Sequence, residues 1–162
     1  MKLFKSIFLK SALVATTMIG ASVYASPRLS NAEIVISYSD KLEKEFKENY
    51  GVREKRFIEE TIREEFAKQL NPSATRVEVL VDSVAPNRPT MQQMDNKPGL
   101  SMMSFSIGGA ALSGKAYDAN GTILYSVKYE YTSPTIYDAQ FASTWHDTDY
   151  AIYRFARRFR TN

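Results

Sequence analysis

The sequence predicts an α+β domain with the element order β-α-α-β-β-β-α, in which helices pack on one face of a sheet of about four mainly antiparallel strands. Three observations predict this class. Apolar residues alternate in several segments, they recur at helical spacing in others, and an Asn-Gly turn joins the two clearest strand segments. Strands joined by such a turn pair antiparallel, and a helix with one apolar stripe buries that stripe on a sheet.

The first strand and the first helix follow each other directly. The segment AEIVISYS at 32–39 is apolar and β-branched, which is typical of a strand. In the next segment Leu42, Phe46 and Tyr50 recur at the spacing of a helix face. Gly51 is a natural residue to end this helix, because glycine adopts the left-handed conformation found there.

A second helix, a second strand and a long loop are expected next. The helix over about 53–70 carries an apolar stripe and ends before Pro72, which has no N–H group to continue it. The segment 75–84 alternates like a half-buried strand. Residues 85–99 contain three prolines and show no periodicity, so they are predicted to form a loop. Loops of this length are uncommon in compact domains and are often functional.

A hairpin is predicted over 100–132. The first strand is expected at 100–117, with Met103, Phe105 and Ile107 on one face. Asn120-Gly121 forms the turn, because these residues tolerate positive φ angles. The second strand at 122–132 has its tyrosines on one face, where they are expected to pack under the helices.

The last element has two interpretations. Apolar residues spaced by three and four from Phe141 to Phe159 fit one helix over about 138–160. Alternatively, a loop ends near Thr144, and Thr144 or Asp147 caps a shorter helix.

The N-terminus has the pattern of a cleaved secretory signal peptide. Lys2 and Lys5 form a basic start, residues 13–21 an apolar core, and Ala25 ends a typical cleavage motif. Two regions are therefore expected: a signal peptide at 1–25 and one α+β domain at 26–162. An uncleaved N-terminal anchor is the alternative, but the apolar core is shorter than the roughly 20 residues of a membrane span. The periplasm of a bacterium is the predicted location, with the extracellular space as the alternative.

The predicted mature chain is electrically neutral. Three of the 21 Lys and Arg residues lie in the signal peptide, which has no acidic residue, so 18 cations remain against 18 carboxylates. A nucleic-acid-binding protein needs a basic surface to displace counterions, and this charge balance argues against one. The chain has no Cys, so disulfides and thiolate metal sites are excluded.

The chain's one His and one Trp stand together in STWHDTDY at 143–150. His146, Asp147 and Asp149 are ligand or acid–base types, but adjacent residues on a helix point about 100° apart. The simpler interpretation places the two aspartates at a helix start, where carboxylates are favoured, and Trp145 over the core. The chain offers only His146 as a histidine base for nucleophilic catalysis, and it contains no nucleophile motif. We therefore predict a non-enzymatic protein. The arginines at 154–160 are interpreted as complements to a helix C-terminus.

The long loop and its methionines are the strongest candidates for a binding site. The binding residues predicted in the loop are Asn87, Arg88, Met91, Gln92, Gln93 and Met94. A second hypothesis is a Cu(I) site, because thioethers are soft ligands that suit Cu(I). Its ligands would be Met91, Met94 and Met102. The alternative is that these side chains form a flexible apolar surface.

The hairpin and the C-terminal helix also carry a recurrent pattern. The residues that carry it are Gly114, Tyr117, Asp118, Gly121, Leu124, Phe155, Ala156 and Arg158. They resemble small secreted or lipid-anchored domains of unknown function from proteobacterial envelopes, in which a G-x-L-x-D-x-x-G-x-x-L hairpin precedes a helix ending in FA-x-R. The resemblance implies an envelope location and no activity. This chain lacks the lipid-bearing Cys of many such proteins, so it does not imply anchoring.

Together these features predict an exported binding or interaction protein of the bacterial envelope that uses no cofactor. Its partner would be an envelope protein or a second copy of itself, with no nucleic acid and no membrane span in the mature chain. The alternatives are Cu(I) handling through the methionines and a hydrolase of an envelope polymer that uses His146.

Overall fold

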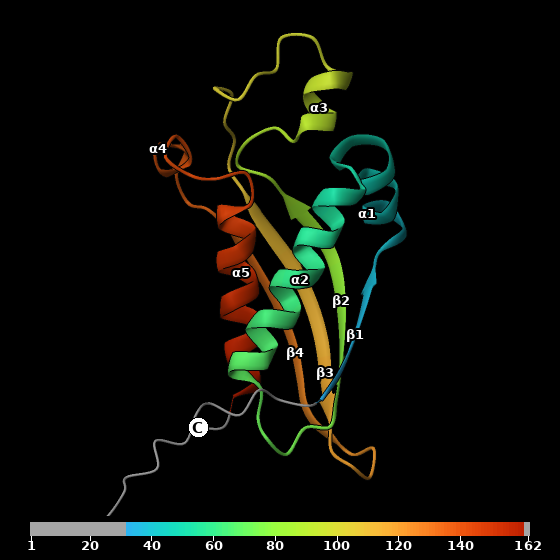
Figure 1. Cartoon of the computed structure of the whole chain (residues 1–162). Coiled ribbons are helices and arrows are strands. Elements are labelled where there is room, and N and C mark those ends of the chain that lie inside the picture. Colours follow the sequence, from blue (N-terminus) through green and yellow to red (C-terminus); the bar gives the residue numbers. More distant parts are fainter. Residues whose placement is uncertain (1–31, 161–162) are drawn as a thin grey trace, which may run out of the picture.

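The computed structural model describes residues 32–160, and the predicted signal peptide at 1–25 lies outside them. The α+β class is confirmed (Figure 1). In chain order the elements are β1 (Glu33–Tyr38), α1 (Asp40–Glu45), a π-helical turn (Phe46–Tyr50), α2 (Val52–Gln69), β2 (Arg76–Ala85), α3 (Met91–Asn96), β3 (Gly109–Tyr117), β4 (Ile123–Thr132), α4 (Ile136–Ala139), α5 (His146–Ala156) and a 3-10 turn (Arg157–Phe159).

The four strands form one open sheet in the order β1-β2-β3-β4. β1 and β2 are parallel, because the helices between them carry the chain back along the sheet. The other two pairs are antiparallel, with Leu80 opposite Ser113 and Leu112 opposite Tyr129. The prediction of a mainly antiparallel sheet of about four strands is therefore confirmed.

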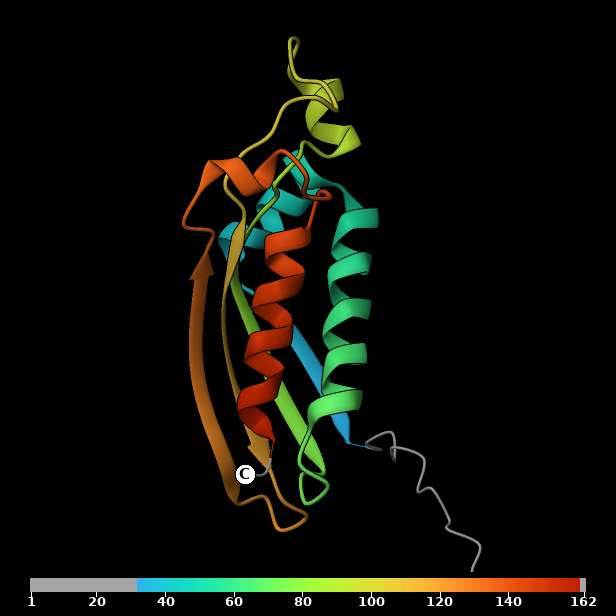
Figure 2. The same cartoon turned by 90° about the vertical axis from the view of Figure 1, so that its left-hand side faces the viewer.

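Helices α2 and α5 lie side by side on one face of the sheet and bury their apolar stripes there (Figures 1 and 2). The core joins Ile58, Ile62 and Phe66 of α2 to Ile152 and Phe155 of α5 and to the inward-facing valines of β2. The tyrosines of β4 pack against its margin, as predicted. Gly114 of β3 allows the close approach of α5, because a Cβ atom there would lie 3.0 Å from the Phe155 ring.

The C-terminal segment follows the second of its two predicted interpretations. A short helix, α4, and a loop precede α5, which begins at His146, so a single helix over 138–160 is wrong. Trp145 is the N-cap residue of α5 and makes no side-chain cap, so the predicted caps Thr144 and Asp147 are also wrong. Phe141 lies outside the stripe and is 86% exposed.

Two boundaries in the middle of the chain also differ from prediction. The loop predicted at 85–99 contains helix α3, which begins with a capping box of Thr90 and Gln93. Strand β3 begins at Gly109 rather than at residue 100. Residues 100–108 have no ladder partner, because β2 ends at Ala85 before Pro86 and β4 ends at Thr132. Met103, Phe105 and Ile107 are therefore exposed loop residues.

Candidate functional site

The loops around α3 and α4 lie at one end of the molecule (Figure 1). These loops carry exposed apolar side chains. We call this the apolar end surface, formed by Met102, Met103, Phe105, Ile107, Tyr137 and Phe141. Met103 is 81% exposed and Tyr137 is 77% exposed. The three most exposed large apolar side chains of the described residues, those of Phe141, Met103 and Tyr137, all belong to this surface, which makes this end the unusual part of the molecule.

Arg88 ties together the two segments that carry this surface. Its Nε donates to the carbonyl oxygen of Ala142 at 2.7 Å, and its Nη1 donates to that of Met102 at 2.8 Å. Nη2 donates to the carbonyl oxygen of Gln140. One guanidinium group thus holds the loop after α3 against the segment after α4. Arg88 was predicted to bind a partner, and the structure places its charged group on the protein's own backbone.

Asn87 is buried at the base of the same end, where β2, β3 and α5 meet. Its side-chain oxygen accepts from the N–H of Asp147 at 3.0 Å, and its amide donates to the Asp147 carboxylate. Its backbone N–H donates to Thr144, and its carbonyl accepts from Ser106. Asn87 was also predicted to bind a partner, but it is 0% exposed and lies out of a partner's reach.

Two glycines and a threonine complete this junction. A Cβ atom on Gly108 would lie 2.5 Å from the Asn87 side-chain oxygen, so only glycine leaves room for that side chain. The N–H of Gly108 donates to Asp147, and the hydroxyl of Thr148 donates to the carbonyl oxygen of Gly109 at 3.0 Å. No local sequence pattern reveals the role of this glycine pair, because Asn87 and Asp147 lie 60 positions apart.

The remaining loop residues dock α3 against the turn that follows α1. Gln92 donates to the carbonyl oxygen of Lys47 at 3.0 Å, and Gln93 closes the capping box with Thr90. Of the six predicted binding residues, the four polar ones therefore make bonds within the protein. Met91 and Met94 are the two whose side chains lack such bonds.

The Cu(I) hypothesis stays a prediction. Met91 and Met94 lie three positions apart on α3, where side chains share a face, and Met102 lies on the loop that follows. Met91 and Met102 are both exposed. Among the described residues, no group of three or more His, Asp or Glu side chains could hold a metal ion.

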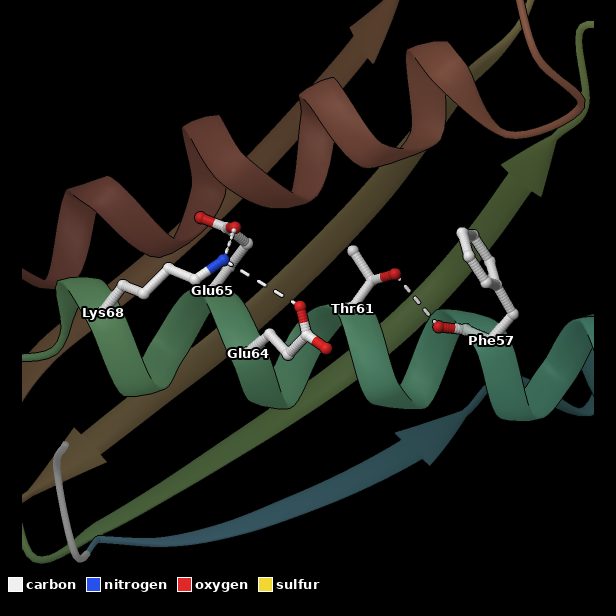
Figure 3. A network of polar contacts seen from close by, with 5 residues as sticks. All are labelled: Phe57, Thr61, Glu64, Glu65 and Lys68. Atoms are coloured by element: carbon white, nitrogen blue, oxygen red, sulfur yellow. Dashed lines mark hydrogen bonds and ion pairs between the residues drawn. The ribbon is translucent and has the colours of Figure 1, made fainter.

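A second candidate site is a groove of about 530 Å³ between α2 and α5. Its lining includes Glu60, Glu64 and Glu65 of α2 with His146 and Asp149 of α5, beside aromatic side chains from both helices. Figure 3 shows the α2 side, where Lys68 bonds Glu65 at 2.9 Å and approaches Glu64 at 3.9 Å. This cation partly neutralises the acidic wall of the groove.

Asp149 is the most perturbed acid of this groove. Burial is the main cause that raises the pKa of Asp149 to about 6; the charge of His146 opposes this rise, and Glu65 adds to it. One carboxylate oxygen of Asp149 is buried and has no hydrogen-bond partner. Asp147, two positions earlier, points elsewhere, into the junction with Asn87, so the two aspartates do not converge.

Trp145 and the C-terminal arginines have structural contacts. The indole N–H of Trp145 donates to Glu54 of α2 at 2.6 Å, and its ring packs on the core, as predicted. The arginines of the last turns lie over tyrosine rings. The pairs are Arg154 with Tyr150, Arg157 with Tyr153 and Arg158 with Tyr129. These contacts favour the structural interpretation of the arginine cluster.

Comparison with known proteins adds no assignment. No protein family, curated protein or solved structure matches this chain. Within residues 32–160, no helix combines the length and apolar character needed to cross a membrane.

Proposed function

We propose that this protein is an exported, non-enzymatic binding protein that holds an apolar segment of another envelope protein on the apolar end surface. The observation that carries the proposal is the group of highly exposed Met, Phe and Tyr side chains on loops that Arg88 ties together. Protein interfaces are enriched in aromatic residues and methionine, and large exposed apolar patches mark interaction sites.

The order of the surface supports this proposal. A flexible loop must lose conformational entropy when it binds, which weakens the complex. Here the Arg88 guanidinium and the Asn87 junction hold the loops before any partner arrives. The loops are therefore already ordered, and only the rotamers of the exposed side chains must become fixed on binding.

The charges near the surface favour a protein over a lipid headgroup layer. A surface that binds anionic lipid carries clustered Lys and Arg residues. The helices at this end carry Asp95 and Asp138, and the loop carries Lys97. The one arginine at the centre, Arg88, has its guanidinium on backbone carbonyl groups.

Export is supported by the sequence pattern of the N-terminus. The test is the intact mass of the protein recovered from the periplasm of its producing cells. The mass of a chain that begins at Ser26 agrees with the proposal. A full-length mass found only in the cytoplasm contradicts it.

Binding is tested by photo-crosslinking in living cells. A crosslinking phenylalanine derivative replaces Phe141 in one strain and Ile123, an exposed residue near the β3–β4 turn, in another. We expect a discrete adduct with a different envelope protein from position 141 and no adduct with that protein from position 123. Adding Met103→Ser should weaken the adduct, because it removes a neighbouring apolar contact. The proposal would be contradicted if both positions gave this adduct in equal yield. It would also be contradicted if Met103→Ser left the yield from position 141 unchanged.

A hydrolase of an envelope polymer is the second candidate, and the groove between α2 and α5 favours it. Asp149, with a pKa of about 6, is suited to exchange a proton near neutral pH, and His146 lies one turn before it. The test incubates the protein with purified peptidoglycan and measures soluble fragments. Release that is lost in His146→Ala supports this candidate, and no release from the unmodified protein removes it.

A further inference from the structure

The free edge of β4 is an open template for another strand. β4 is ten residues long, contains neither proline nor glycine, and is the last strand of the sheet. Figure 2 shows it at the left margin of the molecule, with no other element beyond it. Unprotected edges of this kind pair readily with other strands.

The backbone groups that face outward can be identified. The N–H of Ser133 donates to the carbonyl oxygen of Gly108 at 3.1 Å, so this pair is hydrogen-bonded in the β3–β4 register. Hydrogen-bonded pairs alternate along an antiparallel ladder, so Tyr131, Tyr129, Val127 and Tyr125 also bond β3. The residues between them direct their N–H and C=O groups outward: Ser126, Lys128, Glu130 and Thr132.

The opposite edge of the sheet is protected. β1 has only six residues, and the N–H of Glu33 bonds Thr75, so the groups of Ile34 face outward. Arg63 of α2 reaches over this edge and donates to the carbonyl oxygen of Ile34 at 2.9 Å. Among the described residues, nothing bonds the outward backbone groups of β4 in this way.

We propose that a second copy of this chain pairs with this edge, β4 to β4, in an antiparallel register centred on Tyr129. In this register Lys128 lies opposite Glu130 of the second copy, and Ser126 lies opposite Thr132. All of these residues direct their backbone groups outward, so each pair exchanges both of its hydrogen bonds. The contact is isologous, which means that a two-fold axis relates the copies and the assembly closes as a dimer.

Charge selects this register over its neighbours. Lys128 and Glu130 project from the uncovered face of the sheet, and neither makes an ion pair within the described residues. The proposed register forms the Lys128–Glu130 pair twice. A slip of two residues places Lys128 opposite Lys128 or Glu130 opposite Glu130, and like charges directly opposite each other are destabilising.

The dimer extends the sheet and leaves the apolar end surfaces free. Antiparallel pairing about an axis perpendicular to the sheet keeps the helices of both copies on the same face. On that face Val127 lies opposite Tyr131 of the second copy, and the two Tyr129 residues meet at the axis. Because the strands run in opposite directions, the two apolar end surfaces lie at opposite ends of the assembly.

The test measures the dimer dissociation constant by sedimentation velocity over a concentration series, with protein purified after expression of the full chain. Lys128→Glu and Glu130→Lys should each weaken the dimer by about tenfold or more, because each creates two like-charged pairs. An equimolar mixture of the two variants should recover the dimer, because each charge then faces its opposite across the axis. The double variant Lys128→Glu/Glu130→Lys should also recover it.

Two further variants separate the edge from other causes. Lys115→Glu changes the same charge on β3, away from the edge, and should leave the dissociation constant unchanged. Lys128→Pro removes an outward N–H group that β3 does not use, so it should abolish the dimer while far-UV circular dichroism stays native. A protein that stays monomeric at every concentration would overturn the proposal. A dimer whose dissociation constant is the same in the charge variants would also overturn it.

Discussion

The body of the molecule and its apolar end are ordered by different forces. The body is the sheet with α2 and α5, and most of its fully buried side chains are apolar, among them Ile58, Phe66 and Phe155. The end comprises the loops around α3 and α4, and two polar side chains, those of Asn87 and Arg88, tie it together. Several large apolar residues there are exposed.

The difference shows how a small protein can keep apolar side chains on its surface. Apolar burial is non-directional and draws such side chains inward wherever the backbone allows it. Hydrogen bonds are directional, so a buried amide and a guanidinium can hold two loops in place without using their apolar side chains. The end is therefore ordered while its methionines and aromatic residues stay free for a partner.

The largest effect is expected in the body. Phe155→Ala should lower the free energy of unfolding by about 3–5 kcal/mol, because it leaves a cavity between α2, α5 and β3. Denaturant unfolding followed by circular dichroism measures this change. Tyr153→Ala, two positions earlier and exposed, is the control and should cost far less. Similar losses in both variants would show that α5 is not anchored through Phe155.

Asn87→Ala should have the next largest effect, about 2–3 kcal/mol, because it leaves the buried Asp147 carboxylate and N–H group without their partner. Hydrogen exchange should rise at the start of α5 and at Gly108 and leave α2 unchanged. The control is Asn96→Ala, which removes one exposed bond to the carbonyl oxygen of Glu48. A uniform rise across α2 and the sheet would mean that the end does not open separately from the body.

Arg88→Ala should cost about 1–2 kcal/mol, since the lost bonds come from a charged group that lies partly in solvent. We expect a larger effect on binding, because the two segments of the apolar end surface are no longer held together. Crosslinking from position 141 should fall while the melting temperature changes little. An Arg88→Lys variant should restore only part of the signal, because one ammonium group cannot reproduce the fork geometry.

Asp149→Asn should produce the smallest effect, and it should be a gain in stability. Burial raises the pKa of Asp149 from 3.8 to about 6, so the folded protein holds a proton between these pH values that the unfolded chain has released. This group therefore makes stability fall as pH rises from about 4 to 6. At pH 7 the free energy of unfolding of the variant should be about 1 kcal/mol higher than that of the unmodified protein; solvent screening of the partly exposed Asp149 keeps this gain small. At pH 4 the two proteins should be equally stable.

Thermal unfolding between pH 4 and pH 8 measures this gain. A gain for Asp149→Asn that is as large at pH 4 as at pH 7 would exclude ionisation as its cause.

The class of fold and most of its elements follow from local patterns in the sequence. The stripe of α2, the alternation in β2 and the Asn-Gly hairpin were all readable, because each depends on neighbours within a few positions. The inward tyrosines of β4 and the core position of Trp145 followed from the same local patterns.

The roles of the loop residues depend on contacts between segments that are distant in the sequence. Asn87 and Arg88 look like surface binding residues in the sequence, because polar residues in a proline-containing loop are usually solvated. Their partners, Asp147 and the carbonyl groups of Gln140 and Ala142, lie more than 50 positions away and reach them only after α5 packs on the sheet. Phe141 fits a helical stripe by spacing, yet the chain turns before α5 begins and leaves its ring outside. Periodicity records local geometry, whereas exposure depends on how distant segments meet.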